Sequence, residues 1–415
     1  MKLFFIVFTI FLVMVILFAG IPTLINGFPY HSGSQKAGVF KSSDSGSSWD
    51  LKANTNVAVR TSTSANNTSL RDRSNFGEAE TRRKIGNRQV ATIGVAIDKN
   101  VDRMEFSSGR SNTEISNTNT AFKKEIFDIA LDPQNSKNVY LGTKGAGLVI
   151  ASDSGETWVP VIDSTKELDP KANINKVLIN PKDHGIIYLV VFQKNYGMIL
   201  RSKNSGYSFE TIYITAGIGQ EITALAANPA DPDLIYFGTS NGGLFESNNA
   251  GDSWRVLRWF NSAINVILQS KNSFFIGTSS GLFKTTDRGR TFLELNKKLS
   301  KLDNNASHIF AMSIDRVNPN IIYLGTKYGL LRSKNSGSSF SLVNGLMPVN
   351  SLPIGAIEIS PIDGKIIYVG AGAFIYKSID GGLYWSVEKL PTPLNVRVIK
   401  INPNSPKEIY LGVAE

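Results

Sequence analysis

Short apolar segments separated by polar turns recur along the chain between residues 126 and 413. One kind is rich in aromatic and β-branched residues and ends in Gly-Thr, as in "NVYLGT" from Asn138, "LIYFGT" from Leu234 and "IIYLGT" from Ile321. Another kind precedes it and ends at Asn-Pro or Asp-Pro, as in "IFDIALDP" from Ile126 and "INKVLINP" from Ile174. Runs of this type bounded by Gly, Pro and Asn predict β-strands. The pattern therefore predicts a repeated pair of strands.

A third short strand and a polar turn unit follow most of these pairs, as in "SSDSGSSW" from Ser42 and "SKNSGYSF" from Ser202. Asp or Asn accepts hydrogen bonds from nearby backbone N–H groups, and Gly supplies positive φ, so the unit predicts a tight turn. The aromatic residue that ends the unit starts a fourth strand and buries a large apolar surface. The structural residues of the seven units are Asp44, Gly46, Trp49, Asp153, Gly155, Trp158, Asn204, Gly206, Phe209, Asn249, Gly251, Trp254, Asp287, Gly289, Phe292, Asn335, Gly337, Phe340, Asp380, Gly382 and Trp385.

Four strands repeated at this spacing predict an all-β fold, a seven-bladed β-propeller with four-stranded antiparallel blades. The unit within 38–50 has no strand pair before it, and the pair within 396–413 has no turn unit after it. We expect these N- and C-terminal strands to form one composite blade that closes the ring. Trp49 should then pack in the same blade as Tyr410, and Trp49→Ala should cost about 3–5 kcal/mol.

An insertion at 53–124 leaves an alternative of eight blades. Its first part is polar, and deleting 53–84 should cost little. Its later part, 90–106 and 115–122, resembles a degenerate strand pair and turn unit. We favour seven blades because this part lacks the Asp and Gly that make the turn.

The N-terminus carries an uncharged apolar segment from Leu3 to Ile21. At 1.5 Å per residue, a helix of this length comes close to the ~30 Å hydrocarbon core of a bilayer. Residues 1–21 therefore predict a transmembrane anchor or a cleaved signal peptide, 22–36 a linker, and 37–415 the propeller. We expect a single-pass cell-membrane protein with an extracytoplasmic propeller, or alternatively a secreted protein.

Composition excludes several functions. The 415 residues carry a net charge of +10, but only 19% are charged, so we expect no nucleic-acid partner. Cysteine is absent, which removes disulfides and thiol chemistry. His31, His184 and His308 stand far apart in sequence, so neither a metal nor another cofactor is expected.

The turn units resemble the Asp-box, or BNR, repeat with its S-x-D-x-G-x-x-W pattern. The stretch "IALDPQNSKNVYLGTKGAGLVIASDSGETW" is most similar to photosystem II assembly factors and their relatives in non-photosynthetic bacteria. The chain resembles sortilin-type and xyloglucan-active propellers more distantly. This resemblance implies that the turn units lie at the rim, away from the central site. It also implies a non-catalytic scaffold that binds another protein or assists its assembly.

Basic and aromatic residues in the predicted loops at the propeller mouth are the candidates for binding. Lysines beside aromatic rings can hold an acidic peptide or a glycan through charge and stacking. The alternative is a solvated basic face. The candidates are Lys144, Lys194, Tyr196, Arg258, Trp259, Lys298, Lys327 and Tyr328.

The enzymatic alternative is a secreted glycoside hydrolase, sialidase-like or glucan-active, which needs two carboxyl groups about 5–10 Å apart. Four carboxylates in or near first strands are Asp132, Asp315, Glu221 and Glu358. The early F/Y-R-I-P motif of sialidases is missing, however, and xyloglucan-active enzymes use two propellers where this chain has room for one. We therefore assign no catalytic residue and expect a protein without enzymatic activity.

Overall fold

The computed structural model describes residues 37–52, 54–55, 120–121, 124–270 and 273–415. The predicted anchor and linker, and the degenerate strand pair within 90–106, lie outside the described residues. None of the helices among the described residues has the length and apolar character needed to span a bilayer.

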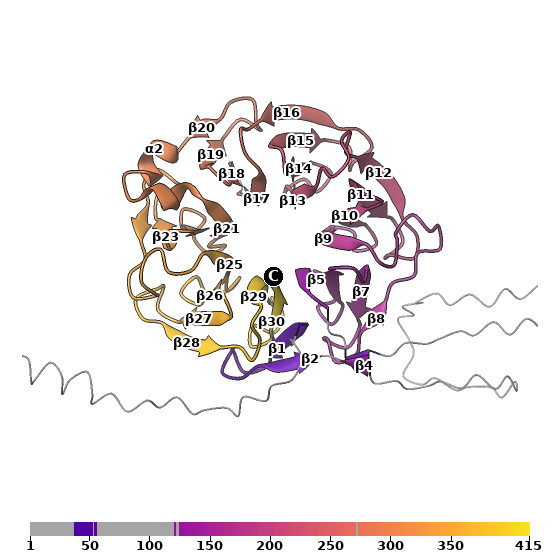
Figure 1. Ribbon diagram of the computed structural model, residues 1–415, viewed down its shortest axis with the longest axis horizontal. Coiled ribbons are helices and arrows are strands. Elements are labelled where there is room, and N and C mark those ends of the chain that lie inside the picture. The colour runs from indigo at the N-terminus through magenta and orange to yellow at the C-terminus, as the bar shows by residue number, and fades with distance from the viewer. Residues whose placement is uncertain (1–36, 53, 56–119, 122–123, 271–272) are drawn as a thin grey trace, which may run out of the picture. The chain divides into compact units, whose positions relative to one another are not determined.

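Seven four-stranded antiparallel sheets stand around a central axis, as Figure 1 shows. The first three blades consist of β5 (Ile126–Leu131), β6 (Val139–Thr143), β7 (Leu148–Ala151) and β8 (Val159–Pro160); β9 (Asn173–Ile179), β10 (Ile187–Gln193), β11 (Tyr196–Ser202) and β12 (Glu210–Ile214); and β13 (Ile222–Ala227), β14 (Ile235–Thr239), β15 (Gly243–Ser247) and β16 (Arg255–Trp259). The next three consist of β17 (Ile264–Gln269), β18 (Phe274–Thr278), β19 (Gly281–Thr285) and β20 (Leu293–Glu294); β21 (Ile309–Ile314), β22 (Ile322–Thr326), β23 (Leu330–Ser333) and β24 (Ser341–Leu342); and β25 (Ile354–Ile359), β26 (Ile367–Ala371), β27 (Phe374–Ser378) and β28 (Ser386–Lys389). A short helix α2 (Asn296–Leu299) and a 3₁₀ turn η1 (Asn304–Ser307) lie between blades 4 and 5.

The seventh blade is composite, as the sequence predicts. Its strands run in the order β29 (Asn395–Ile401), β30 (Ile409–Ala414), β1 (Val39–Ser42) and β2 (Asp50–Lys52). The pairing of β1 with β30 places Val39 opposite Gly412 and Ser42 opposite Ile409. The described residues form seven four-stranded sheets, so the seven-bladed prediction is confirmed and the eight-bladed alternative is not supported.

Trp49 and Tyr410 belong to this composite blade, but they pack against different neighbouring blades. Trp49 packs in the apolar cluster that includes Tyr368 of blade 6, whereas Tyr410 packs with Trp158 of blade 1. Trp158 is fully buried, but Trp49 is only half-buried. The expected cost of about 3–5 kcal/mol for truncating a buried aromatic residue therefore applies to Trp158 and is too high for Trp49.

The turn units form the tight turns that their sequences predict. In the first unit, the Ser42 hydroxyl accepts a hydrogen bond from the Gly46 N–H at 2.7 Å, and the Asp44 carboxylate accepts one from the Ser48 N–H at 2.9 Å. Glycine is needed where the unit meets its own aromatic ring. At Gly155, φ is +85° and a Cβ would lie 3.0 Å from a ring carbon of Trp158, so both the backbone and the packing exclude a side chain.

Polar contacts through these units join four of the blades to the blade that follows. Tyrosine hydroxyls on second strands donate to backbone carbonyls in the turn of the following blade, which ties the outer part of each of these sheets to its neighbour. These bonds run from Tyr188 to Ala250 at 3.0 Å, from Tyr323 to Gly381 at 3.5 Å, from Tyr368 to Ser45 at 2.7 Å and from Tyr410 to Ser154 at 3.0 Å. The last two fasten the composite blade on both sides.

A two-stranded sheet brackets the insertion. Its strands, β3 (Asn54–Thr55) and β4 (Thr120–Ala121), pair antiparallel, with Asn54 opposite Ala121. The two ends of the insertion therefore meet, so the insertion leaves and re-enters the ring at one place.

Candidate functional site

A β-bulge occurs at the same place in all seven innermost strands. We call this end of the channel, where the innermost strands begin, the mouth. The ladder skips the second residue of five of these strands and the third residue of β9 and β29, and such bulges re-aim side chains. The skipped residues form what we call the bulge ring: Phe127, Asn175, Thr223, Asn265, Phe310, Gly355 and Arg397.

Some bulge-ring side chains fasten neighbouring blades, and others face solvent. Asn175 donates to the Ile222 carbonyl at 3.2 Å, and Asn265 donates to the Ile309 carbonyl at 2.8 Å. Phe310 is 41% exposed, and Arg397 is also exposed. The mouth thus offers fixed polar groups beside an exposed aromatic ring and a guanidinium group.

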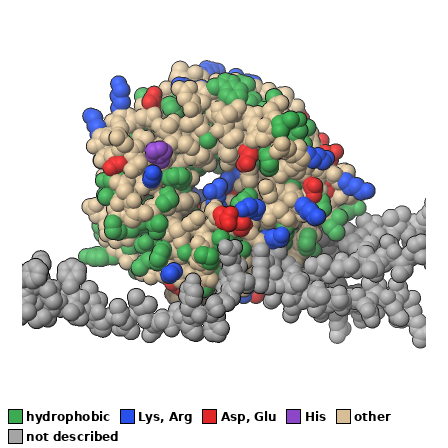
Figure 2. Space-filling model, viewed as in Figure 1, with side chains coloured by type: hydrophobic (Ala, Val, Ile, Leu, Met, Phe, Trp, Pro, Cys, Tyr) green, Lys and Arg blue, Asp and Glu red, His purple; other side chains and the backbone are tan. Residues whose placement is uncertain are grey.

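Two carboxylates stand just outside the bulge ring, each immediately before an innermost strand. Glu125 precedes β5, and Glu221 precedes β13. Lys144 forms an ion pair with Glu125 at 2.9 Å, whereas Glu221 receives only a long contact of 3.4 Å from the amide of Asn175. Figure 2 shows a hollow in the middle of one face, where acidic and basic side chains gather.

The electrostatics of the mouth keep Glu125 ionised. Partial burial raises the pKa of its carboxyl, but the Glu415 N–H, which donates at 3.0 Å, and the Lys144 ammonium outweigh that effect. The net pKa lies below its ordinary value. Glu125 is therefore suited to act as a carboxylate rather than as a proton donor.

Glu358 lies deeper, on the innermost strand β25. Burial raises the pKa of its carboxyl, and Lys400, Arg316 and the Ile401 N–H offset the rise only in part. The residue surface is partly open to the channel, but protein surrounds the carboxyl group. Burial is therefore the cause of the raised pKa.

Asp128 also faces a neighbouring blade from an innermost strand. Its carboxylate accepts from the Val177 N–H at 3.0 Å and from Lys176 at 3.4 Å. Because one carboxylate oxygen accepts from a backbone N–H of blade 2, Asp128 joins blade 1 to blade 2.

Two of the four carboxylates singled out in the sequence hold turns. Asp132 is 1% exposed and accepts from the Gln134 N–H and from Asn138, with His184 at 3.0 Å. Asp315 is also buried and accepts from the Val317 N–H at 2.8 Å. Both stand at the start of the connection between a first and a second strand, so neither is available to a substrate.

The predicted basic and aromatic residues do not form one cluster. Lys144 is at the mouth but is neutralised, since it pairs with Glu415 at 3.4 Å in addition to Glu125. Lys194 lies in the tight turn between β10 and β11, with a positive φ of 51°. Tyr196 and Tyr328 are half-buried and pack against blade cores. Lys327 is exposed in the turn before Tyr328.

The other predicted binding residues lie on outer elements. Arg258 stands 5.1 Å from the centre of the Phe260 ring, and Trp259 is 53% exposed at the end of the outermost strand β16. Lys298 in α2 donates to the Ser338 carbonyl at 2.8 Å. Whether any of these residues binds a ligand stays a prediction.

Sequence reasoning missed Glu125 and the bulge ring. Glu125 carried a usable signal, because it stands directly before a first strand as Glu221 does. The bulges carry no comparable signal, because the skipped residues range from Gly to Phe and Arg. Among the described residues there is no group of three acidic or histidine side chains that could hold a metal ion.

The comparisons with known proteins bear on both fold and function. No family model matches the chain. It is 22% identical over 307 residues to a xyloglucanase from Paenibacillus, a match that covers 60% of this chain and 30% of that protein. It is 24% identical over 208 residues to an oligoxyloglucan-reducing end-specific xyloglucanase from Emericella nidulans, over 44% of this chain and 25% of that protein. The chain thus spans less than a third of these curated relatives.

Solved structures of two kinds share the fold. The GH74 enzyme of Niastella koreensis superimposes with a TM-score of 0.56 at 18% identity, over 70% of this chain and 51% of that chain. YCF48 from Cyanidioschyzon merolae superimposes with a TM-score of 0.54 at 16% identity, over 70% and 95%. Another structure shows YCF48 bound to a D1 peptide, with a TM-score of 0.53. At these identities the likeness shows the β-propeller fold alone.

These findings correct the functional expectation. The sequence led us to expect a scaffold without enzymatic activity, with a glycoside hydrolase as the alternative. The curated relatives are xyloglucanases by name, which contradicts the main expectation and supports the alternative. The error arose because the turn units, which report only on the rim of the propeller, were allowed to decide what happens at its centre.

Proposed function

We propose that this propeller is the glycan-binding unit of a glycoside hydrolase that acts on a β-linked, xyloglucan-like polysaccharide. The similarity to curated xyloglucanases over as many as 307 residues is the observation that carries the proposal. The seven turn units fit the Asp-box type, with Asp or Asn accepting from backbone N–H groups in each turn. They are structural and take no part in the reaction.

The glycan lies across the mouth. Exposed Phe310 offers a surface for the apolar face of a sugar ring, and the exposed guanidinium group of Arg397 offers hydrogen-bond donors. The bonds from Asn175 and Asn265 to neighbouring blades hold the ring rigid, so that few side chains have to be ordered when the glycan binds.

The reaction is hydrolysis of a glycosidic bond between two carboxyl groups. The ionised carboxylate of Glu125 serves as nucleophile or as base toward water, and Glu221 serves as the proton donor to the leaving oxygen. Blade 2 lies between the two blades that carry them, and both stand at the same level of the mouth. The environments of the two carboxyl groups differ, because Lys144 forms an ion pair with Glu125 and not with Glu221.

The test is turnover of xyloglucan, mixed-linkage β-glucan and sialosides by purified protein, measured as the release of reducing ends or sialic acid. We expect hydrolysis of xyloglucan, lowered at least a hundredfold by Glu125→Gln and by Glu221→Gln, in the range for loss of a general acid or base. Glu294→Gln is the matched control, because Glu294 is exposed on the outer strand β20 and bonds only Asn296.

Two results would count against the proposal. Turnover that survives both mouth substitutions but is lost in Glu358→Gln would move the chemistry into the channel. Absence of turnover together with absence of xyloglucan binding would remove the glycosidase assignment.

A further inference from the structure

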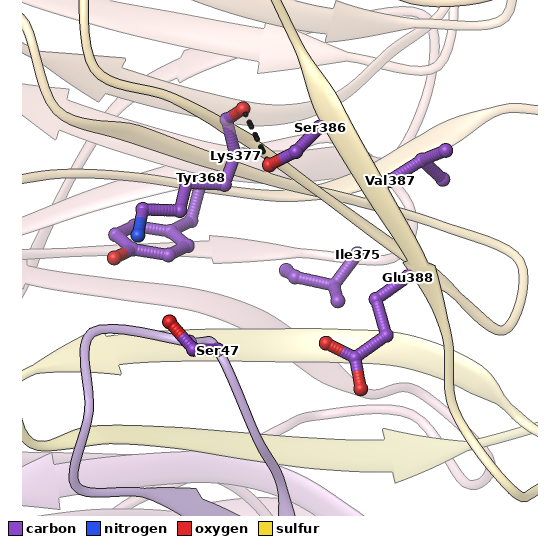
Figure 3. A pocket seen from close by; sticks show the side chains of 8 residues that line it. Ser47, Tyr368, Ile375, Lys377, Ser386, Val387 and Glu388 are labelled. Carbon is purple, nitrogen blue, oxygen red and sulfur yellow. Dashed lines mark hydrogen bonds between the residues drawn. The ribbon is translucent and has the colours of Figure 1, made fainter.

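A small pocket lies between blades 6 and 7, on the outer side of the sheets and away from the mouth. Its volume is about 200 Å³. The strands β26, β27 and β28 form most of its wall, and the turn unit of the composite blade contributes Ser47. Figure 3 shows Tyr368 and Lys377 on one side of the pocket and the Glu388 carboxyl on the other, with Ile375 between them.

Lys377 differs from its counterparts in the other blades. Six blades carry a charged residue directly before the hydroxyl residue that starts the turn unit. Five of these side chains form a hydrogen bond or an ion pair: Lys41 with Glu156, Arg201 with Asp252, Glu246 with Arg255, Lys284 with the Ser336 carbonyl and Arg332 with the Gly381 carbonyl.

The Lys377 ammonium forms neither kind of bond with any residue that the structure describes. It lies 6.0 Å from the centre of the Tyr368 ring, at the edge of the pocket. The Lys377 side chain is half-buried, but its ammonium nitrogen is open to solvent, so acceptors of a ligand can reach it.

The opposite side of the pocket presents the carboxyl group of Glu388. Burial raises the pKa of Glu388, an effect that the nearby Trp49 N–H opposes and Asp44 reinforces. The Trp49 nitrogen is buried and makes no well-formed hydrogen bond. Glu388 can therefore accept from a ligand hydroxyl, and in its protonated form it can also donate.

Hydroxyl groups and apolar side chains complete the pocket. Ser47 is exposed, and the Ser386 hydroxyl lies 3.3 Å from the Lys377 carbonyl. Ile375 is buried beneath them, and Val387 is 58% exposed at the rim. The lining thus combines a cation, a carboxyl, hydroxyls and an aliphatic surface within a space below the ~300–1,000 Å³ of pockets for drug-sized ligands.

We infer that this pocket is a second saccharide-binding site, which holds a single neutral sugar unit of a glycan away from the mouth. A sugar ring presents neighbouring hydroxyls that both donate and accept, which suits a lysine and a carboxyl on opposite walls. Its C–H face suits Ile375 and Val387. The choice of a sugar as the ligand rests on the proposed function. The existence of the pocket and the groups that line it are independent of that proposal.

The experiment observes the pocket directly. Protein labelled with ¹³C in its isoleucine δ1 methyl groups is titrated with cellobiose and with glucose, and the Ile375 signal is assigned from its loss in Ile375→Val. We expect the Ile375 signal of the native protein to move saturably with either sugar. It should not move in Ser47→Tyr, which fills the pocket, and the apparent Kd should rise at least tenfold in Glu388→Gln.

Ser338→Tyr is the matched control, because Ser338 occupies the place of Ser47 in the turn unit of blade 5, and it should behave as the native protein. Circular dichroism of each variant shows whether it is folded. If Ser47→Tyr does not fold, the isosteric Glu388→Gln still decides the question. An Ile375 signal that does not move with sugar, or that moves only with N-acetylglutamate, overturns the inference.

Failure of this inference can be told apart from failure of the proposed function. The titration reports on blade 6, whereas xyloglucan turnover reports on the mouth. Ser47→Tyr should leave turnover of soluble xyloglucan within twofold of the native rate. A protein that turns over xyloglucan but shows no Ile375 response retains the proposed function and loses only this site.

Discussion

The hydroxyl of Tyr410 donates a 3.0 Å hydrogen bond to the backbone carbonyl of Ser154, although 256 positions separate the two residues. Tyr410 lies on β30 near the C-terminal end of the chain, and Ser154 lies in the turn unit of blade 1. The bond therefore spans the junction where the ring closes, on the side of the composite blade that faces blade 1. On the other side, Tyr368 makes the same contact with Ser45 at 2.7 Å.

Tyr410→Phe removes this hydrogen bond while the ring stays in its apolar cluster. We expect the free energy of unfolding to fall by about 0.5–1.5 kcal/mol, the usual net worth of such a bond. Urea denaturation followed by tryptophan fluorescence measures the change. Tyr207→Phe is the control, because Tyr207 is 43% exposed, and it should have no measurable effect. Equal effects of the two substitutions would show that the bond does not stabilise closure.

Removal of the closing strands should be far more damaging than removal of the insertion. Deleting residues 37–52 removes β1 and β2, so β30 loses one of its two partner strands and the composite blade is left with an exposed edge. Replacing residues 56–119 by a short Gly-Ser linker should cost little, because β3 and β4 already pair side by side. Soluble yield and thermal unfolding compare the two deletions. A folded ring without residues 37–52 would refute closure by the composite blade.

Trp158 and Trp49 offer a comparison of the same residue type at the same position of the turn unit. Trp158→Ala should destabilise the protein by about 3–5 kcal/mol, because the indole is fully buried against Tyr410 and Val139. Trp49→Ala should cost less, because Trp49 is half-buried. Chemical denaturation of both variants decides this. A larger loss for Trp49 would show that closure depends on that ring more than its burial indicates.

The sequence could predict the number and the pairing of the strands because both depend on local features that repeat. Asp or Asn with Gly makes the turn, an aromatic residue starts the next strand, and the strand pairs are apolar. The composite blade follows from counting, since a turn unit without a strand pair stands at one end and a strand pair without a turn unit at the other. Nothing in this reasoning depends on contacts between distant residues.

The site could be predicted only in part, because its position depends on how the inner strands are bent. The same bulge skips Asn175, Phe310 and Gly355 in different blades, so the identity of the skipped residue does not predict it. Asp132 and Asp315 looked like candidate acids, yet each holds the turn that follows its strand. The pocket beside Lys377 also escaped notice, because it exists only where blade 6 meets the composite blade.

Glu358 should make stability fall as the pH rises above 4.5, the ordinary pKa of its carboxyl. Its folded pKa is raised, so the protonated carboxyl is favoured in the folded state. The stabilisation is complete below the ordinary value of 4.5 and is lost as the pH rises through the higher folded pKa. Glu358→Gln should remove this loss, so the variant should gain stability over the native protein as the pH increases. Urea midpoints measured across that range test it, and parallel pH curves would contradict it.

Asp287 should produce the opposite dependence at acid pH. Hydrogen bonds from Thr291, foremost that of its hydroxyl, hold the pKa of this carboxyl at about 2, below its ordinary value of 3.8. The folded state therefore favours the ionised form, and its contribution is present above pH 3.8 and lost as the pH falls toward about 2.

Substitutions between Asp and Asn in the turn units test this dependence. Three turn units, including that of Asn335, carry Asn at the position of Asp287 and keep the same backbone contact without a charge. Asp287→Asn should thus leave stability nearly unchanged at neutral pH and reduce its decline in acid, whereas Asn335→Asp should add such a decline. Thermal unfolding between pH 7 and pH 2 measures both. An unchanged acid decline in Asp287→Asn, together with none added in Asn335→Asp, would show that the carboxylates of the turn units do not govern acid stability.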